Sequence, residues 1–138
     1  MEICHNIILI DDDTMFNYLH KKNFAKHGYF PQLNEFINAR DALQFIATCP
    51  SPEPVIVLLD INMPGMDGWA FLDELQQMEE RIIQKYKVIM LSSSVSAADV
   101  TRATAYKIVY GYLFKPLQME MLRDILSRLD IVLPGKKD

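Results

Sequence analysis

The chain has little cysteine, no basic surplus and no long apolar run, and each shortage excludes a class of protein. Its 138 residues include two cysteines, Cys4 and Cys49, without a metal-binding or redox spacing, so two reduced thiols are expected. The net charge of -4 leaves no basic surplus to neutralise the phosphates of a nucleic acid, which argues against direct nucleic-acid binding. No apolar run approaches the ~18 residues that cross a bilayer, and the N-terminus lacks a signal-peptide pattern. We therefore expect a cytoplasmic protein without membrane insertion.

Five stretches have the composition of strands, and helical patterns separate them. Four are short apolar runs rich in β-branched residues, which is typical of strands buried in a parallel sheet. These four cover residues 7–10, 55–59, 88–91 and 110–114. A weaker strand is expected over residues 30–36, at a sheet edge because Pro31 cannot donate a ladder hydrogen bond. The alternation predicts an α/β fold, a doubly wound five-stranded parallel sheet with helices on both faces.

Apolar residues at helical spacing mark the segments between these strands. The first helix is expected over residues 14–27 with Gly28 as its stop, the second over residues 39–48 after the cap Asn38, and the fourth from the cap Ser96 through Lys107. The expected inward-facing residues are Phe16, Leu19 and Phe24 in the first helix, Leu43 and Ile46 in the second, Phe71, Leu72, Leu75 and Met78 in the third, and Leu122, Ile125, Leu126 and Leu129 in the last. The length fits one domain over residues 1–138, with its core at about 6–130 and a C-terminal tail at 131–138. We expect Pro134-Gly135 to end the last helix and the residues after it to fray.

Polar residues suited to phosphate chemistry follow four of these strands. They are Asp11, Asp12 and Asp13 after the first strand, Asp60 after the third, Ser92 after the fourth and Lys115 after the fifth. Ligands of open parallel α/β sheets bind at the carboxyl ends of the strands, so we expect these side chains to meet at one edge. A carboxylate can attack phosphorus and form an acyl phosphate, and clustered carboxylates bind Mg²⁺. The pattern predicts a site for phosphoryl transfer with a divalent cation.

These motifs resemble the receiver domain of two-component response regulators over about residues 6–129. The resemblance rests on Asp11-Asp12, on Asp60 and the loop that ends at Gly68, on Ser92, and on Lys115-Pro116, all in this order. It implies a flavodoxin-like (βα)5 fold with strand order 2-1-3-4-5, here as a stand-alone single-domain regulator. It further implies a phosphorylation switch rather than an enzyme, which phosphorylates and dephosphorylates itself without turning over an external substrate.

The resemblance also implies a role for each site residue. Asp60 is the expected phosphoacceptor. Mg²⁺, or alternatively Mn²⁺, is expected on Asp12, Asp60 and the backbone carbonyl of Asn62, with Asp11 acting through water. Ser92 and Lys115 are expected to hold the phosphoryl oxygens.

Two further positions are implied to pass the signal on or to time it. Ser92 and Tyr112 would couple phosphorylation to the surface formed by the fourth helix, the fifth strand and the last helix. Asn62 and Ser94 stand at the two positions that in this family tune how long the phosphate survives. The expected partners are a sensor histidine kinase or a histidine phosphotransfer protein, and a downstream effector protein.

Other interpretations of these residues stay open. A phosphorelay intermediate, which passes the phosphoryl group on to a histidine phosphotransfer protein, needs the same site. A phosphatase of the haloacid dehalogenase type also uses a strand-end aspartate, Mg²⁺ and a lysine, and Asp11-x-Asp13 fits its first motif, but Met15 stands at its Thr or Val position and Asp60 is left without a role. A packing role for Tyr112 is an equal alternative to switching. The three histidines, His5, His20 and His27, are expected at the surface or the edge of the core.

Overall fold

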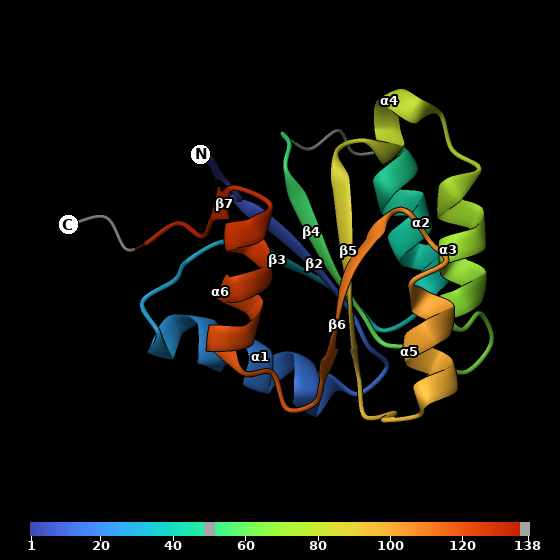
Figure 1. Ribbon diagram of the computed structural model, residues 1–138, viewed down its shortest axis with the longest axis horizontal. Coiled ribbons are helices and arrows are strands. Elements are labelled where there is room, and N and C mark those ends of the chain that lie inside the picture. Colours follow the sequence, from blue (N-terminus) through green and yellow to red (C-terminus); the bar gives the residue numbers. More distant parts are fainter. Residues whose placement is uncertain (49–51, 136–138) are drawn as a thin grey trace.

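The computed structural model describes residues 1–48 and 52–135, and its centre is a parallel sheet of five strands (Figure 1). The strands are β2 (Asn6–Ile10), β3 (Gln32–Phe36), β4 (Val55–Leu59), β5 (Tyr86–Ser92) and β6 (Val109–Phe114). Their order in the sheet is β3-β2-β4-β5-β6, which confirms the predicted order 2-1-3-4-5 for the five core strands. β3 is an edge strand, as Pro31 indicated, and it begins at Gln32, after the proline rather than before it. Cys49 and the two residues that follow it, Pro50 and Ser51, lie outside the described residues.

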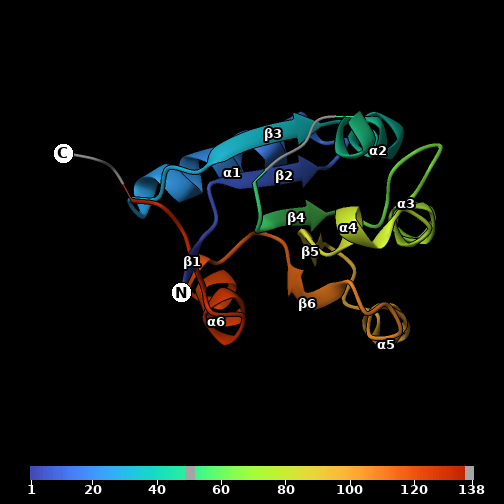
Figure 2. The same ribbon diagram turned by 90° about the horizontal axis from the view of Figure 1, so that it is seen from above.

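Helices cover both faces of the sheet (Figure 2). α1 (Thr14–Lys26) and α6 (Met119–Arg128) lie on one face, while α2 (Ala39–Thr48), α3 (Gly68–Gln76) and α5 (Ala97–Ala103) lie on the other, with a short α4 (Glu80–Ile83) after α3. Successive side chains of a strand point to opposite faces of the sheet. Because helices cover both faces, every side chain of β4 is buried. Ile56 and Leu58 pack with residues of α1 and α6, whereas Val57 and Leu59 pack with residues of α2 and α3.

The inward face of α1 differs from the prediction. Its buried residues are Asn17, His20 and Phe24, whereas Leu19 is 48% exposed. Asn17 faces inward because its side-chain amide donates to the backbone carbonyl of Asp11 at 3.0 Å. A hydrogen bond to the preceding loop therefore sets the rotation of this helix. The prediction of inward-facing residues is confirmed for Phe24, which is buried, and wrong for Leu19.

Two other helices end earlier than predicted. α3 ends at Gln76, so Met78 packs against the core from the turn that follows. α5 ends at Ala103 rather than at Lys107. The Thr104 hydroxyl donates to the Thr101 carbonyl at 2.6 Å, and the next backbone amides bond three residues back instead of four. Such side-chain bonds compete with continuation of the helix.

The predicted C-terminal tail is wrong for residues 131–135. β7 (Ile131–Val132) pairs in parallel with β1 (Glu2–Ile3), and Gly135 forms an antiparallel bridge with Tyr29. Ile131 and Leu133 are buried in the cluster that also contains Cys4, whose thiol is free. Apolar burial therefore holds this segment on the domain. α6 ends at Arg128, so Pro134-Gly135 does not end this helix as predicted. Residues 136–138 lie outside the described part of the chain, in which no helix is both long and apolar enough to cross a membrane.

Candidate functional site

Three acids and one lysine meet at the carboxyl edge of the sheet. One carboxylate oxygen each from Asp11, Asp12 and Asp60 lies within 4.8 Å of the others. The Lys115 Nζ lies 2.5 Å from Asp11 Oδ2 and 3.3 Å from Asp60 Oδ2. Asp12 is exposed, whereas the other three side chains are 5–7% exposed. The predicted meeting of strand-end side chains is therefore what the fold produces.

The charges of this cluster are only partly balanced by the chain itself. Burial raises the pKa of the Asp60 carboxyl, the Lys115 ammonium opposes that rise, and the negative charge of Asp11 adds to it. One ammonium faces three carboxylates, so the ionised cluster has an excess of negative charge. Three carboxylate oxygens close together are hard ligands of the type that Mg²⁺ prefers, and a divalent cation would relieve their repulsion. The donor set fits a divalent metal ion.

The loop after β2 fixes the side chains of Asp11 and Asp13 through contacts with backbone amides. Asp11 Oδ1 accepts a hydrogen bond from the Asp13 amide at 2.9 Å. Asp13 caps α1, because its Oδ1 accepts from the amides of Met15 at 2.9 Å and Phe16 at 3.4 Å. Asp13 thus has a structural task as the N-cap of α1. The haloacid dehalogenase alternative would need that carboxylate for catalysis, so the cap argues against it.

The loop after β4 keeps the backbone of Asp60 close to the start of α3. The Asn62 amide donates to Asp60 Oδ1 at 3.4 Å, and Asp67 caps α3 by accepting from the Ala70 amide at 2.9 Å. A Cβ at Gly68 would stand 2.8 Å from the Asp60 backbone oxygen and 2.8 Å from Ile61 Cα. Only glycine allows this close approach, which explains its place in the loop.

The loop after β5 links the predicted switch residues to one another. Ser92 is fully buried and its Oγ accepts from the Ser94 amide at 3.1 Å. The Tyr112 hydroxyl donates to the Ser94 carbonyl at 2.9 Å, and Ser94 Oγ donates to Asp99 Oδ2 at 2.6 Å. Among the described residues no hydrogen bond joins Ser92 to the acids. The structure therefore brings Ser92, Ser94 and Tyr112 together beside the acid cluster, while their switching and timing roles stay predictions.

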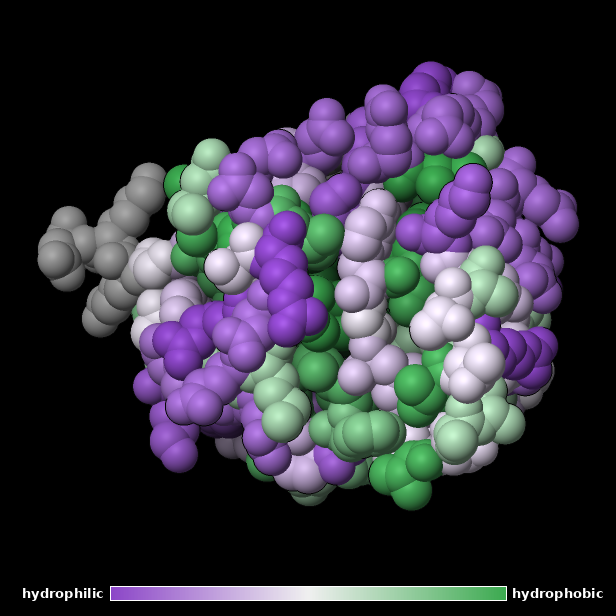
Figure 3. All heavy atoms as spheres, in the orientation of Figure 1, coloured by the Kyte–Doolittle hydropathy of each residue, from purple (hydrophilic) through white to green (hydrophobic). Residues whose placement is uncertain are grey.

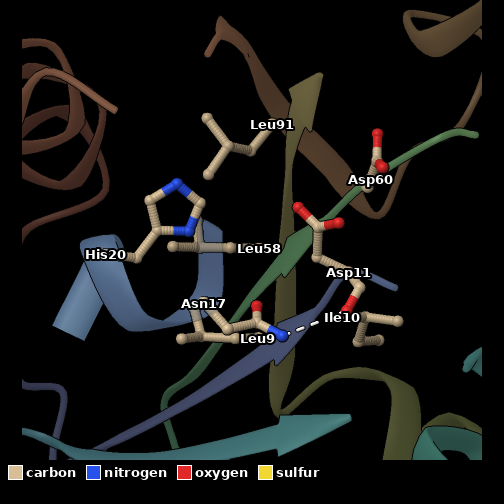
Figure 4. A pocket seen from close by; sticks show the side chains of 8 residues that line it. All are labelled: Leu9, Ile10, Asp11, Asn17, His20, Leu58, Asp60 and Leu91. Atoms are coloured by element: carbon tan, nitrogen blue, oxygen red, sulfur yellow. Dashed lines mark hydrogen bonds between the residues drawn. The ribbon is translucent and has the colours of Figure 1, made fainter. Parts of the chain in front are cut away.

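Two buried residues of α1, Asn17 and His20, lie behind the acids, and nothing in the sequence pattern had marked them as site residues. Figure 4 shows Asn17 and His20 lining a small pocket with Asp11 and Asp60, with the His20 ring across the pocket from Asp60. His20 is 3% exposed, which corrects the expectation of a surface or core-edge position, and its Nε2 has no hydrogen-bond partner among the described residues. Burial lowers the pKa of His20 to about 4, an effect that the charge of Asp11 opposes. The ring is therefore neutral near pH 7.

Phe16 connects this histidine to the lysine. The Lys115 Nζ lies 4.4 Å from the centroid of the Phe16 ring, and that ring lies 6.0 Å from the His20 ring. Phe16 and His20 are one helical turn apart, so they occupy the same face of α1. The sequence signal for this pair is that Phe16 and His20 stand four residues apart at the start of the helix that Asp13 caps.

The fold and the site define a flavodoxin-like α/β protein with an acidic, metal-compatible site at the carboxyl edge of its sheet. The family model of the response regulator receiver domain matches residues 7–127. The chain therefore belongs to the response regulator receiver domain family and is a receiver domain of two-component signalling.

Individual relatives agree with this assignment. The chain is 28% identical to the probable methanogenesis regulatory protein FilR2 of Methanothrix harundinacea over 89% of this chain and 79% of that protein. It is 25% identical to sporulation initiation phosphotransferase F of Bacillus subtilis over 88% of this chain and 90% of the relative. It is 29% identical to the transcriptional regulatory protein MalR of Bacillus subtilis over 88% of this chain, but it spans only 48% of that relative. A response regulator receiver protein from Dyadobacter fermentans has the same fold, with a TM-score of 0.84 at 24% identity over 92% of this chain and 98% of the other.

Proposed function

We propose that this receiver domain is a phosphorylation switch whose phosphoacceptor is Asp60. The observation that supports the proposal is the position of the Lys115 ammonium between Asp11 and Asp60, within an acid cluster that suits a divalent cation. The donor is the phosphohistidine of a sensor histidine kinase or a histidine phosphotransfer protein. A carboxylate oxygen of Asp60 bonds to phosphorus while the phosphorus–nitrogen bond breaks, and the electron pair stays on the imidazole, which takes up a proton.

The remaining site residues hold charge in this step. Asp12, Asp60 and the Asn62 backbone carbonyl would bind Mg²⁺ or Mn²⁺, and Asp11 would act through water. When bound, the cation neutralises the carboxylates and the phosphoryl oxygens. The Lys115 ammonium, which already contacts Asp60 Oδ2 at 3.3 Å, remains beside the transferred group as a point charge. The Ser92 hydroxyl donates to another phosphoryl oxygen.

Phosphorylation then changes a protein-binding surface. When the Ser92 hydroxyl turns to a phosphoryl oxygen, it gives up its hydrogen bond from the Ser94 amide, and the Ser94 carbonyl is the group to which Tyr112 donates. A shift of the loop after β5 therefore biases the position of Tyr112 and the face formed by α5, β6 and α6. Figure 3 shows apolar and near-neutral side chains over β6, between α5 and α6. Tyr110 and Phe114 are 44% and 47% exposed on this strand, which suits the docking of an effector protein.

A phosphorelay intermediate is the second candidate. The relative from Bacillus subtilis named sporulation initiation phosphotransferase F favours it, since the chain spans 90% of that protein. In both functions the domain turns over no external substrate. Incubation of the phosphorylated chain with a histidine phosphotransfer protein separates them, because only the intermediate transfers its phosphoryl group onward.

The decisive experiment is intact-protein mass spectrometry after incubation with acetyl phosphate and Mg²⁺. We expect a gain of one phosphoryl group, which is lost in the Asp60→Asn variant and in the presence of a chelator. Circular dichroism of the variant must match that of the wild-type chain. A folded wild-type protein that gains no phosphoryl group from acetyl phosphate or from a phosphorylated kinase would overturn the proposal.

A further inference from the structure

We propose that Phe16 is a positioning residue for Lys115, holding the ammonium group where it faces the acceptor oxygen of Asp60. The inference rests on the proposed function and deepens it. It assigns a role in phosphoryl transfer to an aromatic residue of α1 that is neither an acid, a metal ligand nor a phosphate donor.

The surroundings of the Lys115 ammonium carry the inference. Two carboxylates approach its Nζ, with Asp11 Oδ2 at 2.5 Å and Asp60 Oδ2 at 3.3 Å, and the Phe16 ring closes a further side with its centroid at 4.4 Å. The lysine side chain is only 6% exposed. A cation over an aromatic face is attracted by the ring quadrupole, and this attraction is stronger when water is excluded. Phe16 therefore occupies a side of the ammonium that water would otherwise fill.

The Phe16 ring is itself held in place from two directions. Its backbone belongs to the first turn of α1, where the Phe16 amide donates to the capping carboxylate of Asp13. Its ring packs against that of His20 at 6.0 Å with 30° between the planes. His20 is buried, so this support does not move freely. The side chain of lysine is long and flexible, and a fixed aromatic wall restricts the region that its ammonium can occupy.

The restriction matters because the two carboxylates compete for the lysine. The contact with Asp11 is the shorter one, and Asp11 is not the acceptor. Without the ring, the ammonium can withdraw toward Asp11 or take up water. Charge stabilisation at the transferred group depends on donors that are already in position before the reaction. Phe16 thus raises the maximal rate of phosphorylation and leaves the affinities for the metal ion and for the phosphoryl donor unchanged.

The test compares Phe16→Leu, which keeps an apolar side chain without a ring, with Phe16→Tyr, which keeps the ring. Initial rates of phosphorylation by acetyl phosphate are measured at saturating Mg²⁺ over a range of donor concentrations. For Phe16→Leu we expect a maximal rate lowered about tenfold, with the half-saturating donor concentration unchanged. Phe16→Tyr should restore most of the rate. Met15→Leu, on the same helix at a site that is 61% exposed, is the matched control and should react like the wild-type chain.

A second measurement follows the geometry without any reaction. In the wild-type chain and in Phe16→Tyr, the aromatic ring current should shift the proton resonances of the Lys115 side chain upfield, and Phe16→Leu should remove this shift. Equal rates for the wild-type chain and folded Phe16→Leu would overturn the positioning role of Phe16 and leave the proposed function intact. A wild-type chain that accepts no phosphoryl group would overturn the proposed function and this role together.

Discussion

The buried histidine of α1 predicts how the stability of the domain depends on pH. His20 is 3% exposed, and its Nε2 has no hydrogen-bond partner within the part of the chain that the structure describes. Burial lowers its pKa from 6.5 to about 4, so the folded state binds a proton less readily than the unfolded state does. The stability contributed by this difference is fully present above pH 6.5. It is lost as the pH falls through the range between the two pKa values, because protonation favours the unfolded chain.

The size of this effect follows from the two pKa values. Between about pH 7.5 and about pH 5, the linkage relation gives a loss of roughly 2 kcal/mol in the free energy of unfolding. The His20→Leu variant has no group to titrate and no buried nitrogen without a partner. We expect it to be at least as stable as the wild-type chain at the higher pH, because an unpaired buried polar atom is destabilising. We also expect its loss of stability on acidification to be smaller by that same amount.

Urea denaturation followed by circular dichroism at the two pH values measures this difference. Metal-free buffer keeps divalent cations off the acid cluster at both pH values. Asp60 titrates with the opposite sign, since its pKa is raised in the folded state, but this contribution is common to both chains. His5→Gln, which changes an exposed histidine, is the control and should keep the wild-type pH dependence. If His20→Leu keeps it too, the reasoning about a neutral buried histidine is refuted.

Three further predictions concern the loops that carry the acids. Asp13→Ala removes the acceptor for two amides of α1 and should cost about 1 kcal/mol in urea denaturation; an unchanged midpoint would contradict the capping role. Gly68→Ala places a methyl group 2.8 Å from the Asp60 backbone oxygen. We therefore expect the free energy of unfolding to fall by roughly 1–3 kcal/mol and phosphorylation by acetyl phosphate to be slower. A fully stable, fully active variant would count against the close approach. Asp60→Asn removes a buried carboxyl whose pKa is raised, so its metal-free unfolding midpoint in urea should lie above that of the wild-type chain, and a lower midpoint would refute the electrostatic argument.

The sequence predicted the central sheet well because burial on both faces leaves a clear signal. β4 consists of five apolar residues, all buried, and such a run has few alternatives to a central parallel strand. The strand ends were equally informative, since parallel strands present their carboxyl ends at one edge. Asp11, Asp60 and Lys115 are 49 and 55 residues apart along the chain, yet the topology alone brings them into contact.

The errors arose where a polar contact or a distant pairing decides the local structure. Leu19 was expected inside α1, but Asn17 faces inward because the Asp11 carbonyl needs a donor. β1 and β7 are two residues long and pair across almost the whole chain, so neither has a periodicity that a sequence window can detect. α5 ended early through the Thr104 hydroxyl, which competes with the backbone in a way that helical spacing does not reveal.

The errors on α1 have a physical reason of their own. The helix has to support the acid cluster from behind, and aliphatic side chains can supply neither a donor for the Asp11 carbonyl nor an aromatic face for the Lys115 ammonium. Asn17 and Phe16 supply these contacts. His20 packs against Phe16, and its Nε2 has no hydrogen-bond partner in residues 1–48 and 52–135. Stability and site geometry therefore make opposite demands on the same helix face. Where a buried position of a receiver domain holds a polar residue in place of an apolar one, its contacts with the strand-end residues are the first explanation to test.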